Sequence, residues 1–346
     1  MTTTTLGAAD IARHRHAHAT QRRTIIGALV GLVIALFALS LMVGQSFYTP
    51  LEVIRVIAGD DVAGATFAVG RLRLPRAALA VVTGLSFGLA GVTFQTMLRN
   101  PLASPDIIGI SAGSSAAAAF AIIILGLSGP AVSLFAIVAG LGVALLVYGL
   151  AFSGGAAGTR LILVGIGIAA MLDSIINYVL SRAGQWDLQE ALRWLTGSLN
   201  GTTWAQVIPA LVSLAVLGPA LLSRSNDLRS MQLGDDTAAA LGVRVERTRF
   251  IVIVAAVGLI AFATAAAGPI SFVAFLSGPI AARIVGPRGS RFLPAALVGA
   301  VLVLAADLCG QYAFGTRFPV GVVTGVLGAP YLIYLIVRTN RSGGSI

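Results

Sequence analysis

Long apolar stretches recur along almost the whole chain, and most of them are close to the length of one membrane span. An α-helix needs about 20 apolar residues to cross the hydrocarbon core of a bilayer. Apolar residues make up 57% of this chain and charged residues only 10%. Because a backbone in lipid must satisfy its own hydrogen bonds, such segments form helices. The sequence therefore predicts an all-α polytopic membrane protein with about ten transmembrane helices.

The apolar stretches and the polar segments between them divide the chain into regions. Ten spans are predicted, at residues 24–46, 74–98, 107–126, 130–152, 160–182, 204–223, 249–267, 270–285, 294–312 and 321–337. The spans near residues 107 and 270 are short or interrupted by Gly and Pro, which is typical of broken helices that line cavities. The first stretch is too long for a signal-peptide core, so we expect it to be retained. Residues 24–337 thus form the transmembrane domain, between a disordered tail at 1–23 and a short tail at 338–346.

The distribution of arginine predicts the orientation of these spans. With the N-terminus inside, 16 of the 23 arginines fall on the cytoplasmic side and 7 on the outer side. Loops rich in arginine remain in the cytoplasm during insertion. We therefore expect both termini in the cytoplasm, which agrees with an even number of spans.

Several classes of function are excluded by residues that are rare or missing. The chain contains no lysine, which a P-loop requires to reach nucleotide phosphates, so any ATP hydrolysis must occur on another polypeptide. Its single cysteine, Cys309, allows neither a disulfide framework nor a cysteine-based metal site. Basic patches interleaved with aromatic residues are absent, so nucleic acid is not an expected partner. We expect no cofactor and no bound metal.

Residues 224–249 form the one long charged segment between two apolar stretches. Its middle is predicted to be a short amphipathic helix with Asp235 and Asp236 in the first turn, where the helix dipole favours acids. One face would carry the residues at helical spacing, namely Leu233, Thr237, Ala238 and Leu241. Gly242 is placed to end the helix in a left-handed cap. Such a helix is a candidate docking element for a soluble partner, and the alternative is an ordinary solvated loop.

Four motifs make the chain recognisable. They are RLPRAALAVVTGLSFGLAGVTFQTMLRNPLASPDIIGISAG from Arg73, LGDDTAAALG from Leu233, AAAGPISFVAFLSGPIAARIVGP from Ala265 and FPVGVVTGVLGAP from Phe318. Together they resemble the permease signature of the iron–siderophore and vitamin B12 family of ABC importers, which are type II importers. The resemblance implies ten helices per subunit in the bacterial cell membrane. It also implies several partners: a second permease subunit, identical or paralogous, a cytoplasmic ABC ATPase dimer, an external substrate-binding protein and the surrounding lipid.

The resemblance also assigns roles to single residues. The ATPase-coupling segment would be Leu233, Gly234, Asp235, Ala238, Leu241 and Gly242, with Asp235 where the family usually has Glu. Arginines that dock the binding protein would be Arg73 and Arg76. The vitamin B12 permease has a further arginine where this chain has Gln311, and Arg317 is a candidate substitute. The cytoplasmic gate would be formed by Asn100, Leu102, Gly158 and Thr159. In the eighth helix, many relatives have Pro-His where this chain has Gly278-Pro279.

The sequence also allows other functions and other roles for some of these residues. Residues 109–113 match the G-x-S-x-G pattern of serine hydrolases, but all three histidines lie in the N-terminal tail, so the catalytic base is missing. Asp173 and Asp307 are acids inside predicted spans, which makes a proton- or ion-coupled secondary transporter the second hypothesis. Asp307 would alternatively pair with an arginine.

Arg73 and Arg76 could instead anchor to lipid phosphates. As cargo, a ferric siderophore is favoured by family frequency, and vitamin B12 and haem remain alternatives.

Overall fold

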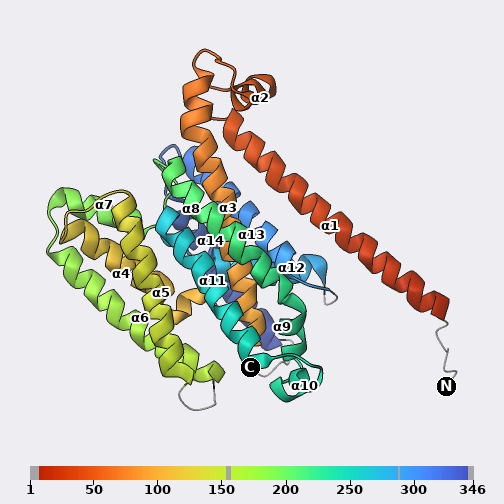
Figure 1. Cartoon of the computed structure of the whole chain (residues 1–346). Coiled ribbons are helices and arrows are strands. Elements are labelled where there is room, and N and C mark those ends of the chain that lie inside the picture. Colours follow the sequence, from red (N-terminus) through yellow and green to blue (C-terminus); the bar gives the residue numbers. More distant parts are fainter. Residues whose placement is uncertain (1–7, 153–156, 287–288, 342–346) are drawn as a thin grey trace.

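The computed structural model describes residues 8–152, 157–286 and 289–341, and these ranges contain helices and no strand (Figure 1). The helices are α1 Ala8–Met42, α2 Pro50–Ala58, α3 Leu74–Met97, α4 Ile110–Ile123, α5 Pro130–Phe152, α6 Ala157–Ser181, α7 Gln185–Leu195, α8 Trp204–Ser223, α9 Ser225–Met231, α10 Asp235–Ala240, α11 Val245–Ala267, α12 Val273–Val285, α13 Phe292–Tyr312 and α14 Val320–Arg341. A π-helix, η1 Thr66–Arg73, leads into α3, and a 3-10 helix, η2 Pro105–Ile108, precedes α4.

The ten predicted spans all correspond to helices. Within the described ranges, seven helices are long and apolar enough to cross a membrane, and they come from α1, η1 with α3, α5, α6, α8, α11 and α13. Three shorter apolar helices, α4, α12 and α14, cover the remaining predicted spans. Two of these three were predicted to be short or interrupted. The chain is therefore an all-α polytopic membrane protein.

The two ends of the bundle carry different elements (Figure 1). The short helices α2 and α7 lie at one end, while α9 and α10 lie at the other. The N-terminal end of α1 lies on the same side as α9 and α10. This arrangement agrees with the prediction that the start of the first span and the central charged segment share one side, which the arginine distribution predicts to be the cytoplasmic side.

Helix α3 forms the centre of the bundle and packs against α8, α11, α12 and α13. Its glycines allow this close approach. A Cβ atom on Gly84 or Gly88 would collide with the backbone of α13, and one on Gly91 would collide with the backbone of Ala274 in α12. Small residues at helix crossings gain packing contacts that larger side chains would prevent. Most of α3 is consequently buried.

A polar joint fixes the broken helix α12 to α3. Pro279 has no backbone N–H, so the carbonyl of Phe275, four residues earlier, has no partner within the helix. The side chain of Gln95 from α3 donates to this carbonyl at 2.9 Å. A Cβ atom on Gly278 would overlap the amide oxygen of Gln95, so glycine is required for the joint to form. The Gly-Pro pair therefore has a packing function in this chain.

The terminal segments differ from the prediction. Helix α1 begins at Ala8, so residues 8–23 are helical, whereas the sequence analysis predicts a disordered tail over 1–23. Helix α14 likewise continues to Arg341, beyond the predicted end at 337. Residues 1–7 and 342–346 lie outside the described ranges. Figure 1 shows α1 running diagonally away from the bundle at its N-terminal end.

Candidate functional site

Arg73 ends the π-helix η1 and is bound within the subunit. Its guanidinium donates to the carbonyl oxygens of Leu41 and Met42, both at 2.9 Å, and to that of Ser46 at 2.7 Å. It also lies over the ring of Tyr48, 4.9 Å from the ring centroid. Leu41 and Met42 end α1, where free carbonyls and the helix dipole favour a cation. Arg73 therefore caps α1, a role that no local sequence pattern indicates because the carbonyls that it binds lie 31 and 32 positions earlier in the chain.

Arg76 lies in the first turn of α3 and forms a buried ion pair with Asp307 of α13. Its Nη2 donates to Asp307 Oδ1 at 2.7 Å and its Nε donates to Oδ2 at 2.9 Å, a bidentate geometry. The Asp307 side chain is only 3% exposed and that of Arg76 17%. Asn200 Oδ1 accepts from Arg76 Nη1 at 2.6 Å, and the side-chain amide of Gln311 donates to Asp307 at 2.8 Å. Asp307 thus pairs with an arginine, one of the alternatives that the sequence left open.

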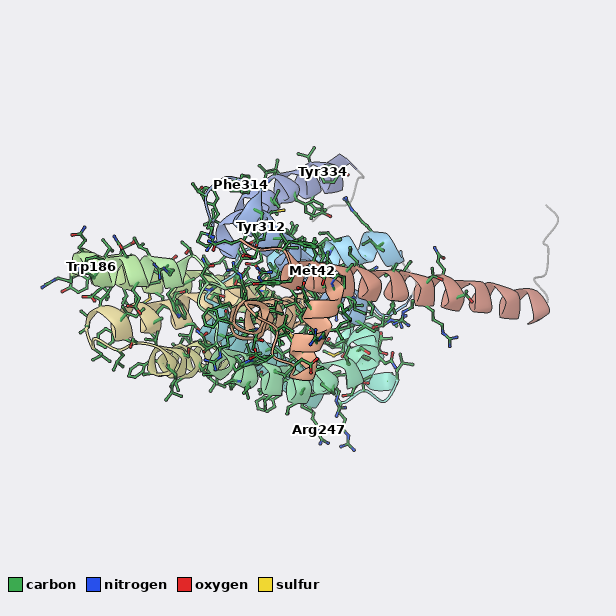
Figure 2. The ribbon with its side chains drawn as sticks, turned by 90° about the horizontal axis from the view of Figure 1, so that it is seen from above. Met42, Trp186, Arg247, Tyr312, Phe314 and Tyr334 are labelled. Carbon is green, nitrogen blue, oxygen red and sulfur yellow. The ribbon has the colours of Figure 1, made fainter. Side chains whose placement is uncertain are left out.

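The three arginines predicted for docking line one cavity of about 530 Å³ at the outer end. Arg73 and Arg76 are held as described, whereas Arg317 is exposed and makes no hydrogen bond or ion pair with other described residues. The phenol of Tyr312, on the same wall, donates to the carbonyl of Val43 at 3.0 Å and ties α13 to the end of α1. Figure 2, seen from above, shows Met42 and Tyr312 close together near the centre of this end. The cavity is therefore basic, preorganised and open to the outside.

At the opposite end, α10 forms as predicted but is shorter. Asp235 and Asp236 occupy its first turn, and Gly242 has a φ of +88°. The N–H of Gly242 donates to Ala239 O and that of Val243 to Ala238 O, which together make a Schellman cap. The prediction of a left-handed cap at Gly242 is confirmed.

Of the four residues predicted for one face of this helix, Thr237 and the two leucines are exposed and Ala238 is not. Leu233 and Leu241 are exposed, at 67% and 64%, but Ala238 is fully buried. The helix runs only from Asp235 to Ala240, so Leu233 precedes it and Leu241 is its C-cap. Ideal helical spacing does not apply across those ends, and Ala238 packs into the core of the subunit. The large apolar side chains accessible on this segment are therefore the two leucines that flank α10.

Asp235 connects this segment to two other helices. One carboxylate oxygen accepts from Arg99 Nη2 at 3.0 Å, and the other accepts from Arg249 Nη2 at 2.6 Å. Arg99 follows α3, and Arg249 lies in α11. The same Arg99 nitrogen also donates to the carbonyl of Met231 at 2.6 Å, which ends α9. We call these three side chains the Arg99–Asp235–Arg249 bridge.

The predicted cytoplasmic gate begins at the residue after Arg99. The Asn100 side chain accepts from the N–H of Leu102 at 2.8 Å and closes a tight turn. Leu102 packs against a buried apolar cluster of α12 and α14 that contains Phe275 and Leu335. The other two predicted gate residues, Gly158 and Thr159, are at the start of α6, and their side chains lie outside the described part of the structure. Two of the four residues predicted for the gate, Asn100 and Leu102, therefore lie directly after the bridge residue Arg99.

Asp173 behaves differently from Asp307. It is exposed on α6 and makes no hydrogen bond or ion pair with the residues that the structure describes. Among those residues, no group of three His, Cys, Asp or Glu side chains lies close enough to hold a metal ion. Of the two acids in predicted spans, Asp307 is held in an ion pair with Arg76 and Asp173 is not.

Comparison with known proteins assigns the chain to a family. Residues 32–338 match the FecCD transport family. The chain is 41% identical over 293 residues to the ferric enterobactin transport system permease protein FepG of Escherichia coli, covering 84% of this chain and 88% of the relative. It is 37% identical to the achromobactin transport system permease protein CbrC of Dickeya dadantii, covering 90% of each chain.

A solved structure agrees with this assignment. A metal-chelate type ABC transporter in an inward-facing conformation superposes with a TM-score of 0.81 and 26% identity, covering 91% of this chain and 99% of that chain. The sequence match spans the helices that carry the basic cavity, the coupling segment and the gate. From its sequence and its fold, the chain belongs to the FecCD transport family of ABC importer permeases.

Proposed function

We propose that this chain is the membrane permease subunit of an ATP-driven importer that brings a ferric siderophore or related iron chelate into a bacterial cell. The cargo is inferred from relatives named for ferric enterobactin, achromobactin and ferric citrate. The mechanism is inferred from one observation: a basic outer cavity and a leucine-flanked inner helix occupy opposite ends of the bundle built around α3. The subunit itself performs no bond chemistry, and alternating access moves the chelate.

The inner end would receive the ATPase dimer. Leu233 and Leu241 supply exposed apolar area, which is the surface a protein partner buries most favourably. Gly234, with a φ of +116°, and Gly242 form the two turns that project this helix. Asp235 and Ala238 would act through contacts within the subunit, since Asp235 holds the bridge and Ala238 anchors the helix in the core.

The outer end would receive the binding protein. Arg317 is exposed and available for acidic residues of the partner. Arg76 is already bound to Asp307, so it would offer the binding protein only its remaining donor capacity. Arg73 would act indirectly, because it fixes the end of α1 on the wall of the same cavity. Rim arginines would mainly set the association rate and its salt dependence.

Between these ends, Asn100 and Leu102 would close the path on the cytoplasmic side, together with Gly158 and Thr159 and their counterparts in a second permease subunit. That subunit is either a copy of this chain or a paralogue. The hydrogen bond between Asn100 and Leu102 would fix the shape of the gate turn. The packing of Leu102 against α12 and α14 would hold that turn in place when the path is closed.

Reconstitution in proteoliposomes tests the proposal. The permease is combined with its genomically neighbouring ATPase and binding protein, and uptake of radiolabelled ferric catecholate, hydroxamate and citrate chelates is measured beside vitamin B12 and haem. We expect uptake of an iron chelate that requires ATP, the ATPase and the binding protein. Uptake driven by a proton or sodium gradient without ATP would overturn the mechanism, and uptake of vitamin B12 or haem alone would overturn the cargo.

A further inference from the structure

Arg99 has an unusual backbone conformation at the point where α3 ends. Its φ is +52°, and it is one of two non-glycine residues with positive φ in the described ranges. A residue with a long side chain rarely adopts the left-handed region, because its Cβ crowds the following carbonyl. Such strained positions persist where surrounding contacts hold them, and they gather at functional sites. Here the backbone closes a Schellman cap on α3, because the N–H of Arg99 donates to Thr96 O at 3.3 Å and that of Asn100 to Gln95 O at 3.1 Å. The guanidinium adds contacts to the coupling segment.

That guanidinium attaches the end of α3 to the coupling segment. Its Nη2 donates both to the carbonyl of Met231 and to the carboxylate of Asp235, at 2.6 and 3.0 Å. Met231 ends α9 and Asp235 begins α10, so one side chain spans the turn between the two short helices. Because Asp235 also binds Arg249 of α11, its carboxylate is shared by three parts of the chain.

The next residues of the chain form the visible part of the predicted gate. Asn100 follows Arg99 directly and closes the turn with Leu102. The backbone N–H of Asn100 also donates to Gln95 O at 3.1 Å, which continues the turn from the last residues of α3. A displacement of α10 that pulls on Asp235 would therefore act on Arg99 and, one residue later, on the gate turn.

We propose that Arg99 is a positioning residue that transmits movement of α10 to the gate turn at residues 100–102 through the Arg99–Asp235–Arg249 bridge. This inference rests on the proposed function, and it identifies the contact that would join the ATPase-coupling segment to the cytoplasmic gate. Arg99 and Asp235 are about half exposed, at 47% and 46%. Exposed ion pairs contribute little to stability, so this contact is able to change during a transport cycle without unfolding the subunit.

Two single variants and one double variant test the transmission. Arg99→Met and Asp235→Asn each remove the charge pair while keeping much of the side-chain size, and Arg99→Asp with Asp235→Arg reverses it. The matched control is Arg229→Met, which removes an exposed arginine of α9 that has no hydrogen bond or ion pair with other described residues. Asp235→Glu retains the charge and serves as the conservative variant.

The primary measurement is the number of chelate molecules transported per ATP hydrolysed in proteoliposomes with the ATPase and the loaded binding protein. We expect Arg99→Met and Asp235→Asn to lower this ratio at least about fivefold, while the ATPase still copurifies. Asp235→Glu and Arg229→Met should keep the wild-type ratio. The charge reversal should recover part of the loss in the single variants.

A second measurement follows the turn itself. Cys309 is replaced by Ala and a cysteine is introduced at Pro101, which is exposed. Its labelling rate should differ between the ATP-bound and nucleotide-free complexes, and the difference should disappear in Arg99→Met.

The outcomes separate this inference from the proposed function. If the wild-type complex transports the chelate with ATP, but Arg99→Met and Asp235→Asn keep the normal ratio and the normal labelling change, the transmission role is wrong. If the wild-type complex itself shows no ATP-dependent uptake, it is the proposed function that fails.

Discussion

The two ends of α3 both use arginine–aspartate pairs, but in opposite surroundings. At the outer end, Arg76 and Asp307 are 17% and 3% exposed and bind through two parallel hydrogen bonds. At the inner end, Arg99 and Asp235 are 47% and 46% exposed and share a single short contact. Water reaches both members of the inner pair, whereas the Asp307 carboxylate of the outer pair is almost fully shielded from it.

This difference separates a structural contact from a movable one. A charge left alone in a buried site keeps the full cost of its desolvation, so the outer pair must stay paired for α3 and α13 to remain together. A charge freed at the surface is solvated immediately, so the inner pair is broken and reformed at small cost. The outer end of α3 is therefore suited to hold the helix, and the inner end to respond to a partner.

The largest effect should come from breaking the outer pair. Asp307→Ala leaves Arg76 without its carboxylate, and we expect a loss of about 3 to 5 kcal/mol in the free energy of unfolding. The melting temperature of the purified subunit in detergent measures it. The control is Asp173→Ala, which removes an exposed acid without a contact to other described residues. Equal melting temperatures for the two variants would show that the outer pair is dispensable.

A smaller effect should follow from removing the cap of α1. Arg73→Met deletes three hydrogen bonds to carbonyls at and after the end of that helix, and a cation at a partly buried helix C-terminus contributes at most about 2 kcal/mol. We expect faster proteolysis between α1 and α2 and a lower melting temperature than wild type. Arg71→Met, which changes an exposed arginine of the same π-helix, is the control. If both variants resist protease equally, α1 does not depend on this cap.

At the inner end, substitutions that weaken ATPase binding should differ from those that destabilise the subunit. Leu233→Asp with Leu241→Asp changes two exposed side chains, so the melting temperature should stay at the wild-type value while the affinity for the ATPase falls at least about tenfold. Ala238→Leu should do the reverse and destabilise the subunit, because overpacking a full core costs about 1 to 3 kcal/mol. Copurification with the ATPase and thermal unfolding report the two effects. If the double variant bound the ATPase with wild-type affinity, α10 would not be the docking element.

The smallest effect on stability should come from the inner bridge. Arg99→Met should change the free energy of unfolding by no more than about 1 kcal/mol, the usual limit for an exposed ion pair. High salt should weaken the Arg99 contact in wild type and leave the Asp307 contact intact, since buried pairs are poorly screened. A loss of stability as large as that of Asp307→Ala would mean that the two ends of α3 do not differ in the way described.

Features that depend on neighbouring residues were predictable from the sequence. The positions of the ten spans follow from apolar length, and the orientation follows from arginine counts. The first-turn acids and the Gly242 cap of α10 also depend only on local chain geometry. The short helices α4 and α12 were indicated by their Gly and Pro residues, for the same local reason.

Contacts between distant residues were decided only by the tertiary structure. Arg76 and Asp307 are 231 positions apart, and Arg99 and Asp235 are 136 apart. No periodicity in one segment indicates which helix will lie beside it, so the sequence marked these residues as charged or near a motif without pairing them. The burial of Ala238 was missed because helical spacing was extended past the true ends of a helix that spans only Asp235–Ala240. Local chemistry therefore determined the helices and their ends, while the packing of α3 against its neighbours decided which arginines are held and which remain free, because burial and pairing exist only once the helices are assembled.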